Sequence, residues 1–167
     1  MGSGKSSVGL ALSQRLGWRF EDLDARIEAR EGRTIAEIFG DSGEAAFRQA
    51  EREELKTLLH EIPHSPMVAA LGGGAFAQVE NAALLERSGV PVVFLDAPVE
   101  ELWQRCHASQ QERPLRQSEN QFRQLYEARR RFYMKAGTRV DTSGRDVDSI
   151  AAELALQLGF DHEGKEK

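Results

Sequence analysis

The sequence predicts an α/β fold in which helices cover a parallel β-sheet. Two compact apolar runs, "MVAALGGG" and "PVVFLDAP", stop at glycine or proline, which is typical of buried parallel strands. Segments with apolar residues at helical spacing lie before, between and after these runs. This alternation, in a chain of 167 residues without an internal repeat, indicates one layered domain with right-handed crossovers.

The first helix is expected directly after a glycine-rich start. Val8, Ala11, Leu12 and Leu16 recur at helical spacing, and Gly17 stands where a left-handed helix cap belongs. The stretch "WRFEDLD" then reads as the end of a short strand that leads into a turn.

A helical insertion interrupts the alternation over about residues 24–60. It begins with "ARIEAREG" and continues with "TIAEIFG", which Thr34 and Glu37 open as a capping box. A long helix follows from about Gly43. We expect these helices to cover one end of the sheet.

The second half of the chain returns to alternating strands and helices. A helix over about residues 79–88 joins the two apolar runs, and "GTRVDTSG" predicts a last short strand. The apolar face of the final helix carries Val147, Ile150, Ala151, Leu154 and Leu158. The polar stretch "CHASQQERPLRQS" indicates a mobile loop between two helices, and residues 160–167 form a polar tail.

Charge and cysteine content exclude several classes of partner. Lys+Arg 22 against Asp+Glu 27 gives a net charge of −5, which argues against nucleic acid or an anionic membrane as the main partner. The single cysteine, Cys106, cannot form an internal disulfide, and neither it nor the four histidines show metal-binding spacing. No apolar run approaches the roughly 20 residues of a membrane span. We expect a cytoplasmic protein.

The opening "MGSGKSS" contains the end of a phosphate-binding loop, G-x-x-x-x-G-K-[ST], whose first glycine would fall before Met1. Backbone N–H groups of residues 2–4 would cradle phosphate oxygens, because glycine permits close approach. Lys5 would reach the outer phosphates and Ser6 would bind Mg²⁺. A glycine-rich tag or a chance match is the alternative.

Two aspartates and two arginines are further candidates. Asp22 and Asp24 follow the second strand, where one could hold the metal through water and the other could meet a substrate hydroxyl; solvated turn residues are the alternative. Arg129 shares a helix face with Phe122, Tyr126 and Tyr133, while Arg130 and Arg131 do not. Arg129 could instead be a snorkelling or internally paired side chain, and Arg48 an exposed charge among Glu44, Glu51 and Arg52.

Glycine and arginine also stand at two turns. "LGGG" ends the third strand at Gly72, Gly73 and Gly74, where small residues let a ligand touch the backbone; a plain tight turn is the alternative. Arg113, before Pro114 in the polar loop, could swing over the phosphates and neutralise charge in the transition state, or could simply be solvated.

Together these segments resemble the shikimate kinase family within the P-loop small-molecule kinases. The resemblance covers nearly the whole chain through an ordered set of motifs: "GSGKSSVG", "DLDARIE", "GRTIAEIFGDSGEAAFRQAE", "LGGGA", "VVFLDAP", "RPL", and the late arginine followed by tyrosine. It implies a P-loop kinase-like three-layer fold with a substrate-binding insertion and a lid at about residues 107–118. It also implies transfer of the ATP γ-phosphoryl group to the 3-hydroxyl of shikimate, in aromatic amino acid biosynthesis, by a protein that we expect to be a monomer.

The resemblance also assigns roles to residues by motif. The implied ATP-binding residues are Gly2, Ser3, Gly4, Lys5, Ser6, Ser7, the lid residue Arg113 and the adenine-side residue Arg145. Mg²⁺ would be held by Ser6 and, through water, by Asp22. The implied substrate-binding residues are Asp24, Arg48, Gly73, Gly74 and Arg129, and the implied catalytic residues are Asp24, Lys5 and Arg113.

Some segments depart from the family's pattern. The late motif is "RRRFY", where the family commonly has a proline between arginine and tyrosine, and "RPLR" replaces a more apolar lid end. In the family, the strand before the phosphate loop lies in the middle of the sheet, so we expect the chain to be a truncation caused by a late start codon or a gene fragment. A kinase for another small hydroxy acid such as gluconate, or a non-catalytic relative, are the rival interpretations.

Overall fold

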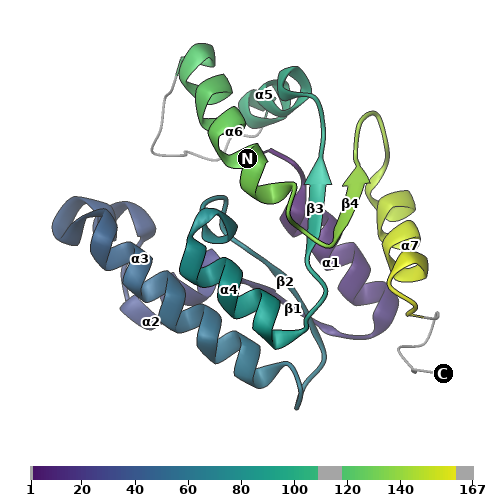
Figure 1. The fold of residues 1–167 in the computed structure, drawn as a ribbon, viewed down its shortest axis with the longest axis horizontal. Coiled ribbons are helices and arrows are strands. Elements are labelled where there is room, and N and C mark those ends of the chain that lie inside the picture. The colour runs from purple at the N-terminus through teal and green to yellow at the C-terminus, as the bar shows by residue number, and fades with distance from the viewer. Residues whose placement is uncertain (1, 109–117, 161–167) are drawn as a thin grey trace.

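The structure is a computed structural model that describes residues 2–108 and 118–160. Strands and helices alternate along the chain (Figure 1). The elements are α1 (Lys5–Leu16), β1 (Arg19–Asp22), α2 (Leu23–Glu31), α3 (Ile35–Glu61), β2 (Met67–Ala70), the short 3₁₀ helix η1 (Ala75–Ala77), α4 (Val79–Ser88), β3 (Val93–Asp96), α5 (Val99–Ala108), α6 (Glu119–Tyr133), β4 (Thr138–Asp141) and α7 (Val147–Gln157). The predicted order of strands and helices is therefore confirmed.

The strands pair in parallel, as predicted, but in two separate pairs. β1 runs beside β2 with Arg19 opposite Met67, and β3 runs beside β4 with Val93 opposite Thr138. Within residues 2–108 and 118–160, no hydrogen-bonded ladder joins β2 to β3. Each of these two strands therefore has one edge without a partner strand.

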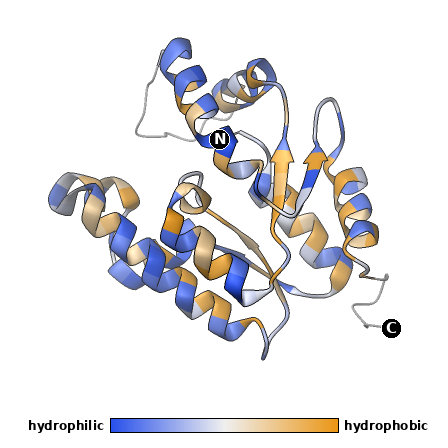
Figure 2. Ribbon diagram, in the orientation of Figure 1, coloured by the Kyte–Doolittle hydropathy of each residue, from blue (hydrophilic) through white to orange (hydrophobic). Residues whose placement is uncertain are grey.

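The apolar core is likewise divided among the described residues. One cluster joins α1, β3, β4 and α7 through residues such as Leu12, Leu95 and Leu154. A second joins α2, α3, β2 and α4, and a third lies between α5 and α6. Figure 2 shows the corresponding hydrophobic colouring on the strands and on one side of α7.

Local signals explain where the helices begin and end. Gly17 has φ 67° and caps α1 in the left-handed conformation, as the sequence predicts. Thr34 and Glu37 form the predicted capping box of α3. Gly43 interrupts α3 with φ 79° and ψ 174°, which agrees with the expected start of a long helix near this residue. The insertion thus consists of α2 and a broken α3.

Ion pairs hold the two insertion helices together. Arg26 of α2 contacts Glu54 at 2.6 Å and Glu61 at 2.7 Å on α3, and Arg30 contacts Glu54 at 3.3 Å. Because the Glu54 side chain is only 6% exposed, these bonds compensate for its removal from water. Among the described residues, no helix combines the length and the apolar character needed to cross a bilayer.

Candidate active site

The glycine-rich start adopts a tight loop that leads into α1. Gly2 (φ 65°) and Gly4 (φ 82°) are left-handed, whereas Ser3 between them is not. A Cβ at Gly2 would lie 2.7 Å from the Leu102 carbonyl oxygen and 2.8 Å from the Cys106 sulfur, so α5 leaves room only for glycine. Alternating backbone conformations at a helix N-terminus turn successive N–H groups toward one point. The loop can therefore bind an anion.

The first turn of α1 is joined to the start of the insertion. Ser6 Oγ donates a hydrogen bond to Asp22 Oδ2 at 2.9 Å, and Asp22 Oδ1 accepts one from the Asp24 backbone N–H at 3.0 Å. Hydroxyl and carboxylate oxygens are hard ligands of the kind that Mg²⁺ prefers. The described residues hold no group of three or more His, Cys, Asp or Glu side chains that could bind a metal. Ser6 and Asp22 therefore fit an ion that takes its remaining ligands from phosphates and water.

The glycine turn after β2 touches two of the predicted site residues. A Cβ at Gly72 would overlap the carboxylate of Asp24, and a Cβ at Gly74 would lie 2.8 Å from both terminal nitrogens of Arg48. The absence of side chains lets both charged groups lie directly on the backbone of one turn. A plain tight turn would not need two such glycines.

Tyr133, at the end of α6, brings Arg129 to the same place. Its hydroxyl donates a hydrogen bond to the carbonyl oxygen of Gly73. Burial raises the pKa of Tyr133, while a hydrogen bond with Arg129 and the charge of Arg48 act against that rise. Both guanidinium groups therefore lie close enough to the Tyr133 hydroxyl to affect its ionisation. Arg48 and Arg129, which are far apart in the sequence, converge beside the glycine turn.

Glu51 lies behind this group of cations, and its burial was not expected. Its side chain is 1% exposed, pairs with Arg48 at 3.0 Å and accepts a hydrogen bond from Asn81 at 3.4 Å. Burial raises the pKa of Glu51, whereas Arg48 and Arg129 lower it and Asp24 raises it further. The charges of Arg48, Arg129 and Asp24 therefore all affect the ionisation of Glu51.

The alternative interpretation of Arg48 as an exposed charge among Glu44, Glu51 and Arg52 is therefore wrong. A signal for the burial of Glu51 is present in the sequence, because Phe47, Glu51, Leu55 and Leu58 fall on one helix face. A carboxylate among apolar side chains on that face needs a partner, and Arg48 supplies it. The Arg48 side chain itself is only 16% exposed, so it is also not a surface charge.

Arg130 differs from the prediction as well. It reaches the 4%-exposed residue Asp96 at 3.0 Å and donates from Nε to the Tyr126 hydroxyl at 3.1 Å. Asp96 also pairs with Arg139 at 2.9 Å. The length of the arginine side chain lets Arg130 bend onto the buried face, which a helical-wheel position alone does not show. Arg131 is exposed, as expected.

The residues predicted to bind ATP lie at several different places in the structure. Lys5 lines the same cavity as Ser3, Gly72 and Gly73. Arg145 follows β4, where it pairs with Glu153 at 2.6 Å and donates to the Asp141 carbonyl oxygen at 3.1 Å. Its partners belong to β4 and α7 rather than to the residues at the glycine turn, Asp24 and Arg48. Ser7 is exposed in the first turn of α1.

Arg113 and most of the expected lid at about 107–118 lie outside the described residues, as does the tail beyond residue 160.

Comparison with known proteins assigns the chain to a family. The sequence model of the family described as shikimate kinase matches residues 1–158. A shikimate kinase of Streptomyces coelicolor is 44% identical over 163 residues, covering 95% of this chain and 92% of that protein. One of Persephonella marina is 35% identical over 154 residues and covers 92% of each.

A solved structure supports the same assignment at the level of the fold. The structure described as shikimate kinase from Acinetobacter baumannii in complex with shikimate superposes with a TM-score of 0.85. It is 36% identical in sequence, and the match covers 95% of this chain and 89% of that one. Since sequence and fold agree over almost the full length, the chain belongs to the shikimate kinase family, whose members are ATP-dependent kinases.

Proposed function

We propose that this protein transfers the γ-phosphoryl group of ATP to the 3-hydroxyl of shikimate, using the residues gathered at the glycine turn. The observation that carries the proposal is that Asp24 and Arg48 lie against Gly72 and Gly74, with Arg129 close to Tyr133, whose hydroxyl bonds Gly73. Ser6 at the end of the phosphate loop and the backbone of Asp24 both donate hydrogen bonds to Asp22, so the phosphate loop and Asp24 are neighbours. A hydroxylated acid placed there would meet the end of a bound ATP.

The two arginines would bind the carboxylate of the substrate. Guanidinium groups offer planar, two-pronged donors that match a carboxylate, which lysine does not. Each charge-assisted hydrogen bond contributes about 1.5–3 kcal/mol, so two arginines suffice to anchor a small acid. The ion pair between Arg48 and Glu51 holds one of the two guanidinium groups in place before the acid binds.

Asp24 would orient the accepting hydroxyl and take its proton. The usual pKa of an aspartic acid, about 3.9, lies roughly ten units or more below that of an alcohol, so prior removal of the proton would cost too much. Proton transfer to Asp24 must therefore come late, when the bond to phosphorus is forming. This order suits a loose phosphoryl transition state, in which alignment and charge neutralisation supply most of the acceleration.

Charge neutralisation would come from the phosphate loop and from the nucleotide-side residues. Lys5 would contact the outer phosphates, and Ser6 with Asp22 would hold Mg²⁺, the latter through water. When bound, Mg²⁺ supplies positive charge that offsets the negative charge of the phosphates. Arg113 would cover the phosphates and Arg145 would lie on the adenine side.

A direct assay tests this function. Incubation of the protein with ATP, Mg²⁺ and shikimate should release ADP and yield a singly phosphorylated acid by mass spectrometry. Gluconate, offered in parallel, should remain unchanged, and phosphorylation of gluconate in place of shikimate would favour the rival kinase. ATP turnover that is independent of shikimate would contradict the proposal.

The non-catalytic alternative makes a different prediction. It requires that nucleotide or shikimate binds without product formation. A Lys5→Ala variant is the matched control, because it removes the phosphate contact while leaving Arg48, Arg129 and Asp24 in place. Product formation that is lost in this variant supports the kinase, whereas binding that is equal in both proteins without any product supports the alternative.

A further inference from the structure

The hydroxyl of Tyr133 takes part in two hydrogen bonds at the end of α6. It donates one to the carbonyl oxygen of Gly73. Its oxygen shares the other with Arg129, and because arginine carries only donors, Arg129 is the donor of this bond. The hydroxyl therefore connects a guanidinium group of α6 to the backbone of the glycine turn.

The aromatic ring of Tyr133 is held independently of its hydroxyl. The ring lies 5.3 Å from the ring of Phe94 on β3. Tyr133 is also the last residue of α6, and this helix packs against η1, which follows the glycine turn. Because a tyrosine side chain has only two rotatable bonds, a hydroxyl on a ring held in this way has a fixed position.

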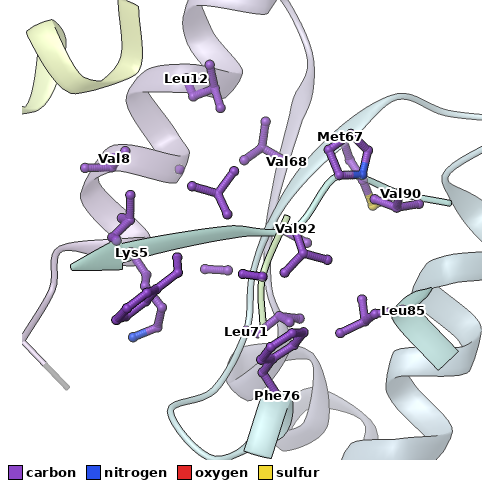
Figure 3. A pocket seen from close by; sticks show the side chains of 18 of the residues that line it. Lys5, Val8, Leu12, Met67, Val68, Leu71, Phe76, Leu85, Val90 and Val92 are labelled. Atoms are coloured by element: carbon purple, nitrogen blue, oxygen red, sulfur yellow. The ribbon is translucent and has the colours of Figure 1, made fainter. Parts of the chain in front are cut away.

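The side chains that flank the glycine turn are apolar. Leu71 before the turn and Phe76 after it both line the cavity that Tyr133 also lines (Figure 3). A backbone carbonyl oxygen beside such side chains costs free energy unless it accepts a hydrogen bond, and Tyr133 supplies one to Gly73. Burial raises the pKa of Tyr133, so its hydroxyl keeps at neutral pH the proton that it donates.

The two arginines beside the glycine turn bond to different kinds of group. Arg48 is paired with the carboxylate of Glu51 at 3.0 Å. The hydroxyl of Tyr133, to which Arg129 donates, is neutral. A neutral oxygen orients a guanidinium group without cancelling its charge, so this bond leaves the charge of Arg129 to act on an anionic ligand.

We propose that Tyr133 is a positioning residue that orients the Arg129 guanidinium toward the carboxylate of the acid, through its hydroxyl rather than its ring. The identity of the acid is that of the proposed function, on which this inference rests, but Tyr133 orders Arg129 before any ligand binds. An arginine loses rotamer freedom when it is fixed, so an Arg129 that is fixed in advance binds the acid more tightly.

NMR of the protein without ligand tests the first step. Tyr133→Phe keeps the ring and removes the hydroxyl, so the order parameter of the Arg129 Nε–H bond should fall below about 0.6, the range of flexible groups. The Nε–H bond of Arg48 is the internal reference and should keep its wild-type value, because Glu44 and Glu51 still hold that side chain. An unchanged order parameter for Arg129 would overturn the proposal.

Calorimetric titration without nucleotide tests the consequence for binding. Tyr133→Phe should raise the Kd for shikimate by about five- to tenfold, which is the range of one intramolecular hydrogen bond, and should leave the Kd for ATP within about twofold. In a protein that already carries Arg129→Ala, adding Tyr133→Phe should raise the Kd for shikimate no further, because the guanidinium that Tyr133 positions is gone. Additive effects of the two substitutions would overturn the proposal.

Ser88→Ala separates positioning from a general loss of stability. Ser88 Oγ also bonds two backbone groups, since it donates to the Leu85 carbonyl oxygen at 2.7 Å and accepts from the Val90 N–H at 3.3 Å. Its removal should lower the Tm by about 2–4 °C, as in Tyr133→Phe, but leave the Kd for shikimate unchanged. A similar rise in Kd in both variants would make the effect one of stability and overturn the proposal.

Phe94→Leu separates the hydroxyl of Tyr133 from its ring. This substitution removes the contact between the two rings and keeps the hydroxyl. It should lower the Tm while the Kd for shikimate stays within about twofold of wild type. A rise in Kd as large as that of Tyr133→Phe would assign the effect to the ring and would overturn the proposal.

The positioning role and the proposed function fail in different ways. If the wild type bound no shikimate but Arg129 lost order in Tyr133→Phe, the proposed substrate would be wrong and the positioning of Arg129 by Tyr133 would stand. If the wild type and Tyr133→Phe bound shikimate with the same Kd, the kinase function would stand and the positioning role would be wrong.

Discussion

Arg48 and Glu51 lie three residues apart on α3 and form an ion pair of 3.0 Å in which the carboxylate is almost completely buried. Arg48 also contacts the exposed residue Glu44 at 3.2 Å, so removing Glu51 would take away the buried one of these two acidic partners. The pair therefore links the stability of the insertion to the position of Arg48, which is a proposed substrate-binding residue.

Glu51→Gln tests this link through pH. Because burial raises the folded-state pKa of Glu51 above the ordinary value of 4.5, its contribution to stability is full below that value and is lost as pH rises through the folded pKa. The free energy of unfolding of the wild type, relative to Glu51→Gln, should therefore fall as pH increases above 4.5. Urea unfolding between pH 4 and 7 measures this difference.

Glu53 provides the matched control for that experiment. It lies on the same helix, but its hydrogen bond with Lys56 lowers its pKa. Its contribution should be present above the unfolded pKa and lost as pH falls, which is the opposite direction to Glu51. If Glu51→Gln and Glu53→Gln gave the same pH dependence, the burial of Glu51 would not control its ionisation.

Arg129→Ala should weaken binding of the acid selectively. Loss of one charge-assisted hydrogen bond of about 1.5–3 kcal/mol corresponds to roughly a tenfold to hundredfold rise in KM for shikimate. The KM for ATP should change little. Arg131→Ala, two residues further along α6 and exposed, should leave both values near wild type. A rise confined to the KM for ATP would refute the role proposed for Arg129.

Asp24→Asn should reduce turnover more than binding. Loss of a positioned proton acceptor typically lowers kcat by about a hundredfold to ten-thousandfold. The nucleotide affinity should stay close to wild type, because the proposed role of Asp24 is toward the substrate hydroxyl and not toward the phosphates. Asp41→Asn, whose side chain is 71% exposed in the wild type, is the control and should keep full activity. Steady-state kinetics that show an unchanged kcat in Asp24→Asn would exclude a role in proton transfer.

Gly72→Ala should disturb the site through space alone. The added Cβ would overlap the Asp24 carboxylate and displace it, and a misplacement of this kind can lower kcat by about a hundredfold. Gly40→Ala meets no heavy atom of the described residues within 4 Å, so it should raise stability by about 0.4–1 kcal/mol. Paired measurements of kcat and Tm on both variants test the difference.

The sequence predicts the order of elements well because the signals involved are local. Gly17, the Thr34–Glu37 capping box and the break at Gly43 depend on neighbours within one helical turn, and all three are confirmed. The division of the sheet into two pairs concerns which strands meet across the molecule, and it depends on contacts between distant segments. The expected parallel sheet is therefore correct in pairing but incomplete in extent.

Within the site, the sequence identifies arginines better than their partners. Arg48 stands out through its motif, but the burial of Glu51 depends on how α3 packs against Asn81 of α4. The contact between Arg130 and Asp96 likewise depends on the flexible length of an arginine. A long side chain can reach several partners in the folded structure, so helical spacing alone does not identify the residue that it contacts.

The hydrogen bond from Arg130 to Asp96 fixes the rotation of α6 about its own axis. Successive residues of an α-helix point about 100° apart, so in the run Arg129-Arg130-Arg131 a slip of one position would present a different guanidinium to Gly73. Asp96 holds Arg130 directly and also accepts the hydroxyl of Tyr126, one turn earlier on the same helix. Two bonds to one carboxylate thus fix which of the three neighbouring arginines lies beside Tyr133, and in the proposed function this arginine binds the acid.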